Sequence, residues 1–216
     1  MEAASHHSLL DTLVAFASSE ERKPELLAAK AEYFRLTGEV FEDDRHFEMR
    51  MASFLDYYVF DHRPPVSGLT AAEEFHRARA AAGAPEASTL EGFTATVHGL
   101  FEVRKLAPGR VRLRELFSGN EYDVSERRTL AGVQKGDVVE ARLIPWQDGL
   151  VFSHAFCFHP REAVKAIKRE VKRRKKKEPD RPPQQLVWEA AKRAVKVERY
   201  RQIAVEKIYD FENSRL

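Results

Sequence analysis

The spacing of apolar residues changes twice along this sequence, and that change limits the folds that the chain can adopt. In the N-terminal part apolar side chains recur at helical spacing, as at Phe47, Met51 and Phe54. Beyond the joint at 83–85 apolar and polar residues alternate as they do in strands, and helical spacing returns after 159–160. The sequence therefore predicts an α+β fold, with an N-terminal helical unit, a small antiparallel β-barrel and C-terminal helices.

Residues 1–85 are predicted to form the helical domain. One amphipathic helix is expected from the acidic start at 42–44 as far as the next prolines, because carboxylates are favourable at a helix N-terminus. Thr70 and Glu73 have the spacing of a capping box, which predicts a short helix that reaches Ala81.

The barrel domain is predicted over residues 90–160. Short alternating runs occur at 93–97, 101–103, 111–114, 121–124, 138–144 and 150–158. Five or six short strands separated by turn signals favour a closed or half-closed antiparallel barrel. Phe152, Phe156 and Phe158 share one face of the last run, so we expect them to fill the barrel.

The strongest local charge follows directly after the predicted barrel. The whole chain has 36 Lys plus Arg against 34 Asp plus Glu, so its total charge carries little information. Between residues 161 and 177, however, ten basic residues and two acidic residues give a local charge of about +8. We predict a basic helix at 161–177, a proline-rich linker at 178–185 and a C-terminal helix at 186–216.

A cationic helix can neutralise phosphates and release their counterions, so it favours a non-catalytic nucleic-acid-binding function. Arg110, Arg112 and Arg114 share one face of a predicted strand and are expected at the surface, because burying unpaired guanidinium groups is costly. The predicted nucleic-acid-binding residues are Arg110, Arg112, Arg114, Arg161, Lys165, Lys168, Arg169, Lys172, Arg173, Arg174, Lys175, Lys176 and Lys177. Phosphate contacts do not distinguish RNA from DNA, so both remain open as partners.

Other interpretations of the charged helix remain open. It can be a solvated helix without a ligand, or a patch for an acidic protein. An adaptor or regulatory protein is the main alternative, with helix 186–209 binding another protein or a second copy of the chain. A membrane surface is disfavoured, because the apolar stripe of Val164, Ile167 and Val171 lacks the large side chains that insert into lipid.

The sequence gives no motif for an enzyme, a metal site or a cofactor. Phosphate-binding loops, dinucleotide fingerprints and nucleophile elbows are missing from it, so we expect neither catalysis nor a cofactor. Cys157 is the single cysteine, which excludes an intrachain disulfide and a cysteine-based zinc cluster. No apolar run reaches the length of a membrane span, and a cytoplasmic location is expected.

The predicted barrel resembles a module of poorly characterised bacterial proteins, some of which also carry a zinc-binding motif of the SecA C-terminal type. The resemblance covers about 95–160 and rests on the segments 101–103, 111–116, 118–119 and 136–145. The cysteine-rich motif is missing from this chain. The resemblance therefore implies neither a metal nor a SecA-type partner here.

A second resemblance is to the PilZ barrel, which binds cyclic di-GMP through an arginine pair and an Asp-x-Ser-x-x-Gly turn. Asp123 and Ser125 begin a similar turn, but Arg128 stands at the position of the glycine. Cyclic-dinucleotide binding is therefore kept as a minor alternative.

Overall fold

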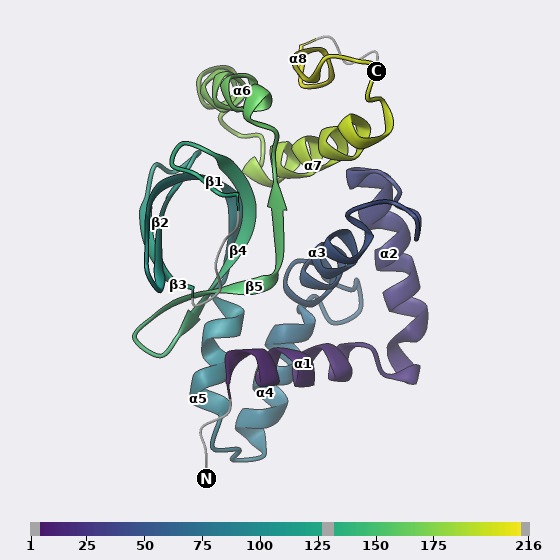
Figure 1. The fold of residues 1–216 in the computed structure, drawn as a ribbon. Coiled ribbons are helices and arrows are strands. Elements are labelled where there is room, and N and C mark those ends of the chain that lie inside the picture. Colours follow the sequence, from purple (N-terminus) through teal and green to yellow (C-terminus); the bar gives the residue numbers. More distant parts are fainter. Residues whose placement is uncertain (1–4, 127–131, 213–216) are drawn as a thin grey trace.

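The computed structural model describes residues 5–126 and 132–212. These residues form a helical unit, a closed barrel of five strands and a C-terminal helical segment, which confirms the predicted α+β fold (Figure 1). The longer helices are α1 (His6–Ala17), α2 (Lys23–Thr37), α3 (Phe47–Phe60), α4 (Ala71–Ala81), α6 (Val164–Lys177) and α7 (Pro183–Arg199). The strands are β1 (Val97–Ala107), β2 (Arg110–Glu115), β3 (Glu121–Ser125), β4 (Val138–Trp146) and β5 (Gly149–Phe158). The described residues also form two short helices, α5 (Ala87–Leu90) and α8 (Val205–Ile208), and 3-10 helices at Glu20–Arg22, Glu91–Thr94 and Arg161–Ala163.

The predicted capping box is present at the start of α4. The Thr70 hydroxyl accepts a hydrogen bond from the Glu73 amide at 3.2 Å, and the Glu73 carboxylate accepts one from the Thr70 amide at 2.9 Å. The α4 helix ends at Ala81, as the sequence predicts. The expected start of the preceding helix at 42–44 is wrong, because α3 begins at Phe47 and the Asp44 carboxylate instead caps the Phe41 amide.

The strand order around the barrel is β1-β2-β3-β5-β4, and β4 closes it against β1. The predicted antiparallel arrangement holds for every pairing except the one between β3 and β5, which is parallel. This exception results from the closure of the barrel. A tight hairpin connects β4 to β5, and along its other edge β5 runs in the same direction as β3.

The first strand of the barrel begins later than the sequence predicts. Residues 91–94 form a 3-10 turn, so the expected strand at 93–97 is wrong, and β1 begins at Val97. Phe93 lies in the core of the helical unit, where its ring packs on Phe60 and Trp146. Gly92 permits this turn, since a Cβ there would lie 2.2 Å from the carbonyl oxygen of Pro145.

The phenylalanine row of β5 divides between the core and the surface. Phe152 is buried and Phe156 is partly buried, but Phe158 is 43% exposed, so its predicted core position is wrong. The pairing of β4 with β5 shifts register between Ala141 and Leu143, which separates Phe152 from Phe156 and Phe158, and Phe158 is the last residue of the strand.

The apolar stripe of α6 packs on the barrel as predicted. Ile167 and Val171 are buried in a cluster with Leu100 of β1 and Val138 of β4. The α7 helix joins the same cluster through Leu186 and also contacts α2, so the C-terminal helices connect the barrel to the helical unit (Figure 1). This packing turns the opposite face of α6 toward solvent.

The connection between α6 and α7 is shorter than the predicted linker at 178–185. Helix α7 begins at Pro183, because a proline fits the first helical turn, where its missing N–H is not needed. The helix expected over 186–216 is also interrupted: α7 ends at Arg199, and α8 follows after a turn. Residues 213–216 lie outside the described part of the chain.

Candidate nucleic-acid interface

Arg174 lies inside the molecule and does not form part of a surface for phosphates. Its residue exposure is 3%, its Nε donates to Glu170 at 2.6 Å, and its Nη2 donates to Glu189 of α7 at 2.6 Å. The inclusion of Arg174 among the predicted phosphate contacts is therefore corrected, because its charge is buried and paired.

Arg173 is also occupied by carboxylates. Its guanidinium donates to Glu170 at 2.7 Å and to Glu178 at 2.6 Å. Burial raises the pKa of the Glu170 carboxyl, but the hydrogen bonds from Arg173 and Arg174 outweigh burial and hold that pKa below its usual range. Both arginines thus stabilise the end of α6.

Two further predicted residues meet at the buried carboxylate of Glu102 on β1. Lys168 of α6 donates to Glu102 at 2.9 Å, and Arg114 of β2 donates to it at 2.6 Å. Arg104 is a third partner, at 3.2 Å. Burial raises the pKa of Glu102, but the hydrogen bonds and charges of Lys168 and Arg114 bring it below the usual range. Glu102 therefore fixes the position of α6 on the barrel.

Arg161 and Lys175 both donate hydrogen bonds to the barrel side. Arg161 donates to Asp137 at 2.8 Å and to the carbonyl oxygen of Gly132 at 2.9 Å. The hydrogen bond from Arg161 lowers the pKa of the Asp137 carboxyl. Lys175 Nζ donates to the carbonyl oxygen of Phe117 at 2.5 Å, so its ammonium keeps an uncompensated charge.

The remaining basic residues of α6 form what we call the open cationic face. It consists of Lys165, Arg169, Lys172, Lys176 and Lys177. All are exposed, and none has a hydrogen bond or an ion pair with any other described residue. The first four follow the spacing i, i+4, i+7 and i+11, which places them on one side of the helix. Their charge is therefore turned toward solvent.

The arginine row of β2 carries less free charge than the sequence predicts. Arg112 forms two hydrogen bonds with Asp123 of β3, at 3.0 and 2.8 Å, and Arg114 is held by Glu102. Arg110 is exposed and has no ion pair within the described residues. The row reaches α6 only at Arg114, because Arg110 and Arg112 lie farther along the strand beside Lys105.

Sequence reasoning missed the residues that organise these cations. Glu102, the Phe117 carbonyl and Leu116 come from the barrel, and Glu189 comes from α7. The alternation of strand residues places Glu102 and Arg104 on one side of β1, but nothing in the local sequence connects either of them to α6.

The described part of the chain contains neither a metal-binding cluster nor a membrane-spanning helix. Within 5–126 and 132–212, no group of three or more His, Cys, Asp or Glu residues is arranged to hold a metal ion. The same residues contain no helix with the length and apolar composition needed to cross a bilayer. Arg128, the residue that departs from the PilZ-like turn, lies outside the described residues, while Asp123 of that turn pairs with Arg112.

Comparison with protein families identifies the family of this chain. A model for a family of unknown function (DUF7986) matches residues 24–187, which is more than half of the chain. The chain belongs to DUF7986. The DUF7986 match extends from α2 through the barrel and α6 to the first turns of α7, so it includes the open cationic face. No curated protein and no solved structure matches the chain.

Proposed function

We propose that this protein is a non-catalytic, cytoplasmic nucleic-acid-binding protein that holds phosphates on the open cationic face of α6. The observation that carries the proposal is the division of charge within one helix. Arg173 and Arg174 are paired with carboxylates, whereas the cations of the open face have no partner among the described residues. Cations that only stabilised the fold would be paired in the same way as the two arginines.

The length of the open cationic face suits a phosphate backbone. A helix rises 1.5 Å per residue, so Lys165 and Lys176 are about 16 Å apart along the axis. One strand of duplex DNA presents a phosphate about every 3.4 Å along its axis, so roughly five phosphates lie over that distance. Binding would release counterions, and affinity should therefore fall steeply as salt rises.

The barrel is expected to add little base recognition. Five-stranded barrels of the OB type bind oligonucleotides on strands 2 and 3, usually by stacking bases on aromatic side chains. The exposed or half-exposed positions of β2 and β3 are mainly charged, with the paired Arg112 and Asp123 at the centre. We therefore propose that Arg110 adds a phosphate contact, and that affinity depends weakly on base sequence.

A protein-adaptor function has less support. The apolar residues of α7, including Leu186 and Val195, are buried within the chain, where α7 packs against α2 and β1. The helix that was expected to bind a partner or a second copy is thus already covered on its apolar side.

The test is binding of fluorescent 20-nucleotide random single strands and 20-base-pair duplexes, measured by anisotropy in 50 mM salt. The variant Lys165→Gln/Arg169→Gln/Lys177→Gln removes three cations of the open face. A matched control, Lys30→Gln/Arg45→Gln/Arg77→Gln, removes the same charge from exposed positions of the helical unit. We expect the first variant to bind at least tenfold more weakly than the wild type, and the control to stay within threefold. No binding by the wild type, or equal losses in both variants, would disprove the proposal.

A further inference from the structure

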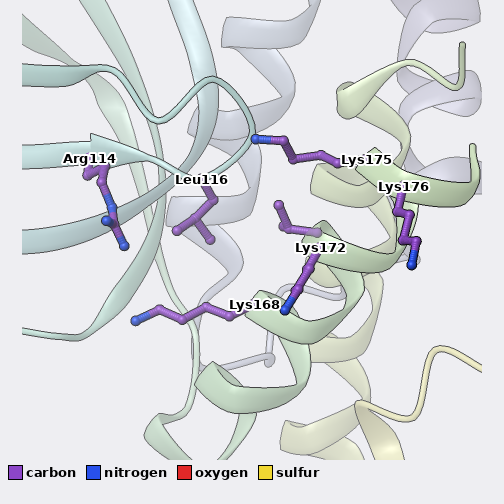
Figure 2. Close-up of a pocket in the computed structure, with 7 residues that line it drawn as sticks. Arg114, Leu116, Lys168, Lys172, Lys175 and Lys176 are labelled. Atoms are coloured by element: carbon purple, nitrogen blue, oxygen red, sulfur yellow. The ribbon is translucent and has the colours of Figure 1, made fainter. Parts of the chain in front are cut away.

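A groove lies between α6 and the end of β2, on the barrel side of the open cationic face. Figure 2 shows Arg114 and Leu116 on the barrel side and Lys168, Lys172, Lys175 and Lys176 on the helix side. The cavity volume is about 410 Å³, and Val171 contributes to its apolar floor together with Leu116. We call these residues the cationic groove.

Three of the cations that line the cationic groove are held in place before any ligand arrives. Glu102 fixes Lys168 at 2.9 Å and Arg114 at 2.6 Å, and the Phe117 carbonyl fixes Lys175 at 2.5 Å. None of the described residues that line the groove is a carboxylate, and Glu102, which holds Lys168 and Arg114, is itself only 6% exposed. Preorganised cations lose little conformational freedom when an anion binds.

Lys172 and Lys176 supply further uncompensated charge, in addition to that of Lys175. They lie one helical turn apart, and neither has a partner in the described chain. Like charges at this spacing repel each other, so an anion between the two ammonium groups relieves that repulsion. These charges favour an anion of high charge density in the groove.

We propose that the cationic groove binds an oligophosphate group, meaning two or more linked phosphates. The cations extend from Lys168 to Lys176, about 12 Å along the helix axis, so a single phosphate cannot contact them all. The floor of Leu116 and Val171 offers neither an aromatic ring nor an amide to recognise a base. Recognition is thus directed at the phosphates, which can belong to a free nucleoside triphosphate or to the 5′-triphosphate end of an RNA strand.

This site does not depend on the proposed nucleic-acid function. Lys168 and Lys175 face the groove, whereas Lys165, Arg169 and Lys177 belong to the open face and do not line it. Lys172 and Lys176 border both surfaces. A chain that binds no oligonucleotide along α6 can still bind an oligophosphate here.

The test uses the full chain, with inorganic tripolyphosphate as the probe, in titration calorimetry at 150 mM salt. We expect tripolyphosphate to bind at least 30-fold more tightly than orthophosphate. Lys172→Glu should weaken tripolyphosphate binding at least tenfold. Its matched control is Arg169→Glu, which has the same charge reversal on the same helix, outside the groove, and should change the affinity less than threefold. Both positions are exposed, and circular dichroism checks that both variants fold.

The results separate this proposal from the preceding one. Retained tripolyphosphate binding with no oligonucleotide binding supports the groove and contradicts the proposed function. Equal weakening by Lys172→Glu and Arg169→Glu, equal affinity for tripolyphosphate and orthophosphate, or no heat of binding at 1 mM tripolyphosphate would overturn the groove proposal. Adenosine triphosphate and RNA 5′-triphosphate oligomers, compared with 5′-hydroxyl oligomers, then identify the source, and tighter binding of either triphosphate supports the site.

Discussion

Nε of Arg174 donates a hydrogen bond to Glu170 across 2.6 Å, inside the junction where Glu189 of α7 meets the same guanidinium. This buried pair stabilises the end of α6, which is one of the most basic segments of the chain. The planar guanidinium bonds two carboxylates at once, which a lysine ammonium does with less geometric fit. The neighbouring lysines on the outer side of α6 need no such partner, because water solvates them.

Replacing Arg174 with Ala should destabilise the fold without weakening oligonucleotide binding. Removing one partner from a buried ion pair typically costs about 3–5 kcal/mol, and we expect the lower end because Arg173 still pairs with Glu170. Lys177→Ala removes the same charge from an exposed position and should change the free energy of unfolding by less than about 0.5 kcal/mol. Urea denaturation measures both values. Equal destabilisation of the two variants would contradict this assignment.

The fold should lose stability in weak acid because of His159. Burial lowers the pKa of this histidine from 6.5 to about 4, and its Nδ1 lies 2.9 Å from the Tyr209 hydroxyl. Between pH 6.5 and 4 the unfolded chain therefore binds a proton that the folded chain excludes, so stability falls as the pH drops. The loss is roughly 3 kcal/mol at 1.36 kcal/mol per pKa unit.

The measurement for His159 is the free energy of unfolding between pH 7 and pH 4. The variant His159→Gln retains a hydrogen-bonding group but has no titrating ring. Between pH 7 and pH 4 its free energy of unfolding should therefore fall by roughly 3 kcal/mol less than that of the wild type. Parallel curves for the variant and the wild type would show that the pKa of His159 is the same in the folded and the unfolded chain, which would contradict the prediction.

Glu102→Gln should raise anion affinity while lowering stability. Lys168 and Arg114 lose the charge of their shared carboxylate, which removes charge-assisted hydrogen bonds worth about 1.5–3 kcal/mol at most. The cationic groove gains one net positive charge, so tripolyphosphate should bind more tightly, by about threefold or more. Glu121→Gln, at an exposed position on β3, is the control and should leave stability nearly unchanged. Weaker tripolyphosphate binding by Glu102→Gln would show that Glu102 favours anion binding by ordering Lys168 more than its negative charge opposes it.

Arg142 should be required for docking of the barrel on the helical unit. It is 2% exposed, lies 3.5 Å from Asp56 of α3, bonds Asp61, and donates to Thr96 at 2.8 Å. Arg142→Met leaves the Asp56 carboxylate buried without its counter-charge, at a cost of about 3–5 kcal/mol. Adding Asp56→Asn should recover part of this loss. Denaturation followed by tryptophan fluorescence measures the cycle, and additive losses would contradict a direct coupling.

The local patterns of the sequence were sufficient for the fold class and for the contact of α6 with the barrel. The capping box at Thr70 and the spacing of Ile167 and Val171 depend on neighbours within a few residues, so they can be recognised without the tertiary structure. The parallel pairing of β3 with β5 could not be predicted in this way, because it depends on how the barrel closes.

The sequence also could not predict which cations of α6 are paired with carboxylates and which are not. The segment 161–177 contains Glu162 and Glu170, but the carboxylates of Glu102 and Glu189 come from distant parts of the chain. Only the tertiary structure brings them to α6 and separates the paired cations from those of the open cationic face. The sequence also does not show that Arg112, in the arginine row of β2, forms an ion pair with Asp123 on the next strand.

The most direct test of the account is the salt dependence of duplex binding between 50 and 200 mM salt. The wild type is compared with a variant in which all residues of the open cationic face are replaced by Gln. For five phosphate contacts, the plot of log affinity against log salt should have a slope of about −4.5, and the variant, which lacks all five cations, should lose nearly all of that slope. A wild-type slope near zero, or a variant that keeps the wild-type slope, would contradict the assignment of phosphate binding to α6.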